Sequence, residues 1–291
     1  MSEEIMPMTD PRPVKQRGQG SGATDAALLF DEPGPRGRIL IAVGSVFAVL
    51  GIAALAGAVL YRLDLAGQLD YPEWRYFLGH SVVSQLLEAA GTTLSLGAVA
   101  AVLTFPLGIA LGWLRLLDNR PVRWLVGLWI DAMRAVPMLL LVYFFLLVVP
   151  RFATVSDFWK LALPIVMCTS ATTAEVFRSG VRALDRGQTE AAWALGMSPS
   201  LTMRLILAPQ ALRLMLPTLI TQMVTIIKGT TLAYVLAYPE LMYRGSTMIG
   251  QAKIDAHLSV FFQTYVIIAV LYIIVNWSLG ALARYIESRT R

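Results

Sequence analysis

The most constraining feature of this chain is a series of long apolar blocks that carry few charges. The first of them, ILIAVGSVFAVLGIAALAGAVLY over residues 39–61, has no charged residue at all. A helix needs about 20 consecutive, mainly apolar residues to cross the hydrocarbon core of a bilayer. We therefore predict an all-α polytopic membrane protein with about six spans, at residues 39–61, 88–115, 125–150, 157–178, 212–238 and 259–283.

The charge content supports this class. Only 15% of the residues are charged and the mean hydropathy is +0.62, whereas an ordinary soluble domain carries about 25% charged residues. The net charge of +5 comes from basic residues that flank the apolar blocks, so we expect no nucleic-acid partner. Cys168 is the single cysteine, and His80 and His257 are far apart in sequence, so neither a disulfide nor a metal site is expected.

Basic residues also predict the orientation of the spans, because loops rich in Lys and Arg stay in the cytoplasm. Arginines concentrate between the second and third spans, around the break between the fourth and fifth, and after the last span. In the opposite loops, 62–87, 151–156 and 239–258, acids such as Glu240 largely offset the basic residues. Both termini are therefore expected in the cytoplasm, with residues 1–38 as a disordered cytoplasmic tail.

The break between the fourth and fifth spans, residues 185–208, predicts two short helices around a turn. The first would begin at Asp185, which forms a capping-box pattern with Gln188. It would end at Gly196, a residue suited to the left-handed conformation just past a helix. The small-residue face of this helix could dock in a groove of another protein or lie on lipid headgroups, and the residues alone leave both alternatives open.

A second short helix would follow in the same break. Ser198 is a favoured N-cap residue, and Pro199 suits the first helical position, where its missing N–H costs nothing. We expect this helix to extend to about residue 208, before Pro209, and to carry the apolar residues Leu201, Met203, Leu205, Ile206 and Leu207.

One motif in this break resembles a known signature. Glu190-Ala191-Ala192 is followed after three residues by Gly196, and after nine more by Ile206-Leu207-Ala208-Pro209. This run is similar to the signature cytoplasmic loop of ABC importer permeases. That signature consists of EAA, three residues, G, nine residues, I, one residue and LP. In this chain Ala208 stands where the signature usually has leucine. Flanking runs resemble the polar amino acid uptake branch, with its glutamate/glutamine-type permeases: GQTEAA, PQALR, AEVFRSGV, RAVP and IIKGTTLAYVLAYPEL.

The resemblance implies a fold and a domain organisation. Residues 86–291 would form a type I ABC importer permease-like domain, with coupling helices at about 185–208. Residues 39–85 would add an N-terminal transmembrane helix and an extracytoplasmic loop. In this family the coupling helices sit in a cleft of the ATP-binding subunit, and the residues implied to make that contact are Glu190, Ala191, Ala192, Gly196, Ser198 and Pro209.

The resemblance also implies partners and a location. These are an ABC ATP-binding subunit dimer, a second permease subunit that is identical or homologous, and an extracytoplasmic substrate-binding protein, all at a bacterial plasma membrane. The chain has no G-x-x-x-x-G-K-[ST] loop to bind nucleotide phosphates. ATP and Mg²⁺ are therefore expected on the partner ATPase, and this chain is expected to hold no cofactor and to be no enzyme.

Lys228 lies near the middle of the fifth predicted span, where ionisable residues are costly and usually functional. Thr221, Thr225 and Lys228 share one helical face at i, i+4 and i+7. A lysine with neighbouring hydroxyls suits an α-carboxylate. The predicted substrate pathway therefore contains Lys228, Thr225, Thr221, Thr230, Thr231 and Arg134. The open alternative is a structural ion pair between Lys228 and Glu175.

Glu175, Arg178 and Arg182 also share a helical face, at i, i+3 and i+7. We predict a structural pairing role for these three residues, with a gating role as the alternative. Pro137, in the RAVP run that starts at Arg134, is expected to kink or break the third span.

Together these features predict the permease subunit of an ATP-driven importer for a polar amino acid. Glutamate is the first candidate, and glutamine or a basic amino acid are alternatives. The rival function is a stand-alone secondary transporter or channel, which inverted repeats or several midplane acids would favour. An intramembrane enzyme is not supported, because no Ser/His, Cys/His or paired-Asp constellation is evident.

Overall fold

Short sequence signals set where the helices of this chain begin. Asn119 Oδ1 accepts a hydrogen bond from the Val122 N–H at 3.2 Å and so caps the helix that starts at Arg120. Prolines stand in the first turn of several helices, where their missing N–H is not needed. The computed structural model describes residues 34–290, and every regular element in that range is helical. The all-α prediction is confirmed.

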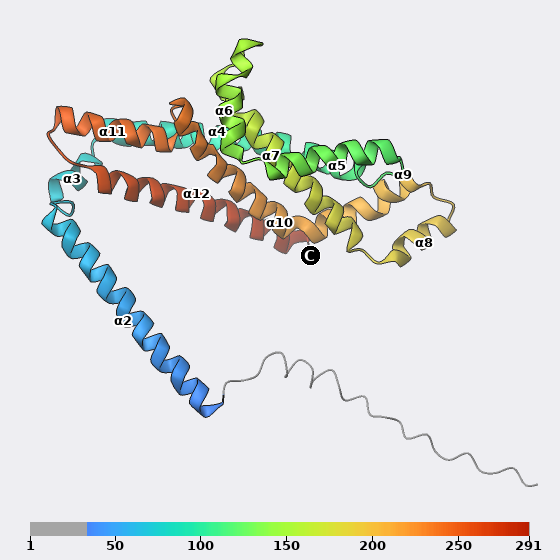
Figure 1. The fold of residues 1–291 in the computed structure, drawn as a ribbon, viewed down its shortest axis with the longest axis horizontal. Coiled ribbons are helices and arrows are strands. Elements are labelled where there is room, and N and C mark those ends of the chain that lie inside the picture. The colour runs from blue at the N-terminus through green and yellow to red at the C-terminus, as the bar shows by residue number, and fades with distance from the viewer. Residues whose placement is uncertain (1–33, 291) are drawn as a thin grey trace, which may run out of the picture. The chain divides into compact units, whose positions relative to one another are not determined.

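Figure 1 shows the helices in chain order. They are α2 (Pro35–Leu65), α3 (Tyr71–Tyr76), α4 (His80–Leu114), α5 (Arg120–Ala135), α6 (Met138–Leu147), α7 (Asp157–Arg182), α8 (Arg186–Ala194), α9 (Pro199–Thr202), α10 (Ala208–Gly229), α11 (Leu241–Asp255) and α12 (Phe261–Thr290). Short 3₁₀ segments occupy Val149–Arg151 and Thr230–Leu236, and a π-helical turn occupies Met203–Leu207. Most of the predicted tail, residues 1–33, lies outside the described range.

The chain divides into two compact units, Met1–Ala66 and Gly67–Arg291. The described part of the first unit is essentially α2, a helix of 31 residues. It is long and apolar enough to cross a membrane, and its membrane-length stretch is 0% buried. These properties suit the N-terminal span predicted at residues 39–61.

The second unit is organised around the contact between α4 and α7. A Cβ added at Gly108 would lie 2.5 Å from Thr173 Cβ, and one added at Gly112 would lie 2.6 Å from Ala174 O. Neither distance is compatible with a side chain, so only glycine permits this approach. Small residues four apart allow helix backbones to pack closely in lipid.

Helix length and apolar composition alone identify fewer candidate spans than the six predicted. Among the described residues, four helical stretches are long and apolar enough to cross a membrane, or five if one bent pair counts as a span. They lie at Arg36–Leu65, His80–Leu114, Pro199–Leu236 and Phe261–Leu282. The predicted span at 157–178 does not qualify. It forms α7, which α4, α5, α6 and α10 surround and whose Thr169, Ser170 and Thr173 are buried. A helix enclosed by protein needs no lipid-facing apolar surface.

The third predicted span, 125–150, is broken at Pro137. Helix α5 ends at Ala135, α6 begins at Met138, and the two form a bend of 95°. Val136 is extended, with φ −79° and ψ 128°, as is usual for a residue before proline. The prediction of a kink or break is confirmed, but the turn is close to a right angle.

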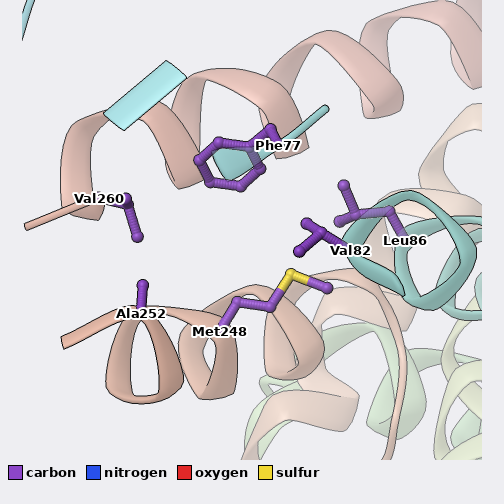
Figure 2. Packing of buried hydrophobic residues seen from close by; sticks show 6 residues of the cluster. All are labelled: Phe77, Val82, Leu86, Met248, Ala252 and Val260. Carbon is purple, nitrogen blue, oxygen red and sulfur yellow. The ribbon is translucent and has the colours of Figure 1, made fainter. Parts of the chain in front are cut away.

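The predicted loop at 239–258 contains a helix that the sequence analysis missed. Helix α11 contacts α4 and α12, and α4 and α11 lie side by side in Figure 1. Figure 2 shows the buried apolar cluster that holds it, which consists of Phe77, Val82, Leu86, Met248, Ala252 and Val260. Glycines and charges interrupt the apolar pattern of α11, so its stability depends on this tertiary packing.

The first prediction concerns the glycine contact between α4 and α7. Gly108→Val should destabilise the protein by about 1–3 kcal/mol, because its side chain would overlap Thr173 and Ser170 O, which lie 2.5 and 2.9 Å from the added Cβ. The measurement is the thermal unfolding midpoint of the purified chain in detergent.

Gly91→Val is the matched control, because Gly91 lies on the same helix and an added Cβ there meets nothing within 4 Å. Equal midpoints for the two variants would contradict the role of the glycine contact.

Candidate functional site

The end of α8 is fixed by backbone hydrogen bonds around a left-handed glycine. Gly196 has φ +75°. Its N–H donates to Trp193 O at 2.9 Å, and the Met197 N–H donates to Ala192 O at 3.1 Å. These two bonds form a Schellman motif, which satisfies carbonyls at the helix end. The predicted end of the first short helix is confirmed.

The start of α8 is capped as predicted, but the reciprocal bond of a capping box is not made. Asp185 Oδ1 accepts a hydrogen bond from the Gly187 N–H at 2.6 Å. Gln188 turns away from this cap, and its Oε1 accepts a hydrogen bond from Gln210 Nε2 at 3.0 Å. This bond ties α8 to the first turn of α10.

The surface of α8 divides into a buried and an exposed side. Ala192 is 1% exposed and packs inward. The outer side is formed by Glu190, Ala191, Trp193, Leu195 and Gly196. Trp193 and Leu195 keep 58% and 81% of their surface exposed, respectively. Small residues beside large exposed apolar side chains suit a docking surface better than a solvated one.

Residues 185–208, which the resemblance assigns to coupling, are called the coupling segment below, and their second half continues directly into α10. Ser198 Oγ accepts a hydrogen bond from the Leu201 N–H at 3.4 Å, and Pro199 begins α9, as predicted. The predicted end before Pro209 is wrong. The helix passes through the π-helical turn Met203–Leu207 and goes on as α10. Pro209 is tolerated because it stands in the first turn of α10, next to the turn whose hydrogen-bond pattern has shifted.

The predicted pathway residues on α10 share an exposed face. Thr221, Thr225 and Lys228 are all exposed in the single chain. The Thr221 hydroxyl donates to Pro217 O at 3.2 Å, and the Thr225 hydroxyl donates to Thr221 O at 3.1 Å. Each hydroxyl oxygen still has lone pairs with which to accept a bond. The structure therefore places one ammonium and two hydroxyl acceptors along one open stripe.

Other predicted pathway residues are separate from this stripe. Thr230 is fully buried, and its hydroxyl donates to Ile227 O at 2.7 Å. Thr231 is half-buried and donates to Lys228 O at 2.8 Å. Arg134 is exposed near the end of α5.

An ion-pair network joins the ends of α4, α5 and α7. Glu175 accepts two hydrogen bonds from Arg178, and its Oε2 forms an ion pair with Arg115 Nη1 at 3.0 Å. Arg115 Nη2 also pairs with Asp131 Oδ2 at 3.1 Å. Arg182 makes no ion pair among residues 34–290.

Because Glu175 is bonded to these arginines, the structure shows no ion pair between it and Lys228. Sequence analysis missed Arg115 and Asp131 as members of the network. The sequence did hold a signal for Asp131, because it is the only acid in the apolar block 125–150.

A buried carboxylate lies beyond the other end of α10, at Glu240, a loop residue whose burial the sequence analysis did not predict. Glu240 is 0% exposed and caps α11. Its Oε1 accepts from the Tyr243 N–H at 2.7 Å, and its Oε2 accepts from the Tyr272 hydroxyl at 2.8 Å. Beside it, the Leu241 N–H donates to Thr93 Oγ1 at 3.2 Å. This cluster connects α4, α11 and α12, and only the tertiary fold brings its members together.

Known proteins share both the sequence and the arrangement of these elements. Residues 104–291 match the family described as the binding-protein-dependent transport system inner membrane component. The chain belongs to this family. It is therefore a membrane-embedded transport component, not an enzyme, and the stand-alone transporter or channel is set aside.

Two curated relatives cover most of the chain. The probable glutamine ABC transporter permease protein of Bacillus subtilis is 33% identical over 198 residues, which cover 68% of this chain and 89% of the relative. The glutamate transport system permease protein of Corynebacterium glutamicum is 34% identical over 230 residues, which cover 77% of this chain and 82% of the relative. Both are named as permeases, as the resemblance of the coupling segment implied.

Solved structures show the same fold. A crystal structure of an amino acid ABC transporter with histidines matches at a TM-score of 0.64 and 23% identity, covering 72% of this chain and 95% of that one. The inward-facing MetNI methionine ABC transporter matches at a TM-score of 0.61 and 15% identity, covering 73% and 99%. The predicted ABC importer permease fold is confirmed.

The second prediction concerns the buried carboxylate of Glu240. Glu240→Ala should lower the free energy of unfolding by about 2–3 kcal/mol, because it leaves the Tyr243 N–H and the Tyr272 hydroxyl without their acceptor. Thermal unfolding of the detergent-purified chain measures the loss. Glu88→Ala is the control, since Glu88 is an exposed glutamate on α4, and a similar loss there would argue against the cluster.

Proposed function

We propose that this chain is the permease subunit of an ATP-driven importer for a polar amino acid, glutamate or a close relative. The observation that carries the proposal is the exposed α8 surface, which a short turn connects to α9, and α9 continues through the π-helical turn into the helix that bears Lys228. Relatives named for glutamine and for glutamate support the cargo class.

In this proposal a separate ATP-binding subunit dimer holds ATP and Mg²⁺ and docks on α8. Closure of that dimer pushes the surface around Glu190 and Gly196. The displacement passes to α10 through the π-helical turn and through the bond between Gln188 and Gln210. Helix α10, which bears the polar stripe, then moves relative to the neighbouring helices. This movement opens the cargo site alternately to the two sides of the membrane.

Two further partners complete the proposed transporter. A second permease subunit, identical or homologous, covers the open stripe of α10 and makes the pathway a space between two chains. A substrate-binding protein delivers the cargo to the extracytoplasmic loops. The termini are both cytoplasmic in a bacterial plasma membrane, which the distribution of arginines supports.

The charge on the stripe favours an anionic or zwitterionic cargo. Lys228 can pair with a carboxylate while Thr221 and Thr225 accept hydrogen bonds from an amino group. Glutamate offers two carboxylates and one ammonium, and it is our first choice. Glutamine retains the α-carboxylate and is the second choice.

The third prediction tests docking. Gly196→Asp should abolish co-purification of the ATP-binding subunit and reduce uptake at least about tenfold, because it strains a left-handed residue and places a charge on the docking surface. Membrane insertion should be unchanged.

The control is Gly250→Asp, because Gly250 is an exposed glycine of α11 with nothing within 4 Å of an added Cβ. If the ATP-binding subunit co-purified fully with the Gly196 variant and uptake were normal, the docking proposal would be overturned.

The fourth prediction tests the pathway. Lys228→Met should reduce uptake of labelled glutamate into vesicles at least about tenfold while the ATP-binding subunit still co-purifies, because the carboxylate loses its counter-charge. Lys253→Met is the control, since Lys253 is an exposed lysine of α11. Unchanged uptake by the Lys228 variant would remove this residue from the pathway.

A further inference from the structure

A basic pocket lies where the ends of α4 and α7 meet the side of α5. Its volume is about 400 Å³, and the residues that give it its chemistry are Arg115, Arg123, Arg178, Arg182, Asp131 and Trp124. The residues of the proposed cargo stripe do not line it. By the distribution of arginines, this end of the helices is the cytoplasmic one.

The pocket carries more positive charge than its own carboxylates neutralise. Asp131 and Glu175 hold Arg115 and Arg178 in the ion-pair network. Arg123 and Arg182 are exposed and make no ion pair within residues 34–290. Four guanidinium groups therefore face two carboxylates, and the two unpaired guanidinium groups come from different helices. An anion between them could pair with both.

Gly127 gives the pocket its depth. The nearest heavy atoms to a Cβ added there belong to the Arg115 guanidinium, beginning with Nε at 3.6 Å. The side chain of Arg115 thus lies across the bare backbone of α5 as it reaches Asp131. A larger residue at position 127 would project into this space.

The walls of the pocket are suited to a lipid rather than to a soluble anion. Trp124 and Leu128 also line it and are 66% and 54% exposed, respectively. Tryptophan favours the headgroup level of a bilayer. A separate apolar groove of about 380 Å³ runs along the same helix, where Leu125 and Trp129 line it together with residues of α4 and α7. Guanidinium groups and lipid-facing apolar side chains therefore stand side by side.

We propose that this pocket binds the phosphate of an anionic phospholipid from the cytoplasmic leaflet. Arg123 and Arg182 hold the phosphate, Trp124 packs against the glycerol region, and an acyl chain follows the apolar side of α5. Basic pockets between transmembrane helices on the cytoplasmic side are suited to such headgroups. The bound lipid clamps α5 to the end of α7.

The position of the pocket gives the lipid a role in coupling. Arg182 is the last residue of α7, and Asp185, which caps α8, follows three residues later. A phosphate that bridges Arg182 to Arg123 holds the base of the coupling segment against α5. This role is independent of which amino acid is carried.

Native mass spectrometry of the full-length chain in detergent tests the proposal, with phosphatidylglycerol and phosphatidylcholine as probes. The wild-type chain should retain one phosphatidylglycerol under conditions that remove phosphatidylcholine. The double variant R123Q/R182Q should bind phosphatidylglycerol about tenfold more weakly, since each interfacial arginine contributes a substantial share of such binding. Gly127→Leu, which fills the pocket, should have a similar effect.

The control variant is R204Q/R284Q, which removes two exposed arginines from the same predicted side without touching the pocket. An equal loss of lipid in this control would overturn a specific site. R123K/R182K keeps the charge and should keep the lipid, which separates binding from misfolding.

Two further outcomes would also overturn the proposal. Displacement of the lipid by inorganic phosphate or glutamate at equal concentration would make the pocket a site for soluble anions. Absence of the lipid from the complete transporter, but not from the isolated chain, would mean that a partner subunit covers the pocket.

Discussion

The packing of α7 against α4 is the constraint on which the rest of the second unit depends. Gly108 and Gly112 let the two backbones come together, and the hydroxyls of Thr104 and Thr169 share a hydrogen bond at 2.7 Å inside the contact. Polar groups are expensive in hydrocarbon unless they are paired. Because α4 and its neighbours enclose α7, the second half of α7 can carry threonines and charged residues.

This enclosed helix leads straight into the coupling segment. Helix α7 ends at Arg182, α8 is capped at Asp185, and the chain returns through α9 and the π-helical turn to α10, which packs on α7 again. The coupling segment therefore connects two helices, α7 and α10, that pack against each other. In the proposed transporter, a force on α8 would reach both helices, since the hydrogen bond between Gln188 and Gln210 ties the start of α8 to the start of α10.

The caps of the short helices were predictable from the sequence, but the burial of a segment by neighbouring helices was not. Asp185, Gly196 and Ser198 act through bonds to residues within a few positions, and their roles as caps hold. The errors share one cause. Residues 157–178 were predicted only as a membrane span and Glu240 only as part of a loop, because nothing in a single segment tells whether neighbouring helices will cover it. The size of the bend at Pro137 depends on the same neighbours.

The open face of α10 bears on the proposed second permease subunit. Lys228, with Thr221 and Thr225 on the same side, is exposed within a stretch long and apolar enough to cross a membrane. A lysine that faces hydrocarbon at the centre of a bilayer costs about 2.5–3.5 kcal/mol on insertion scales. A second permease packed on this face would replace the hydrocarbon by polar groups and water. In the proposed transporter, the residues that bind cargo are therefore the same residues that the second permease covers.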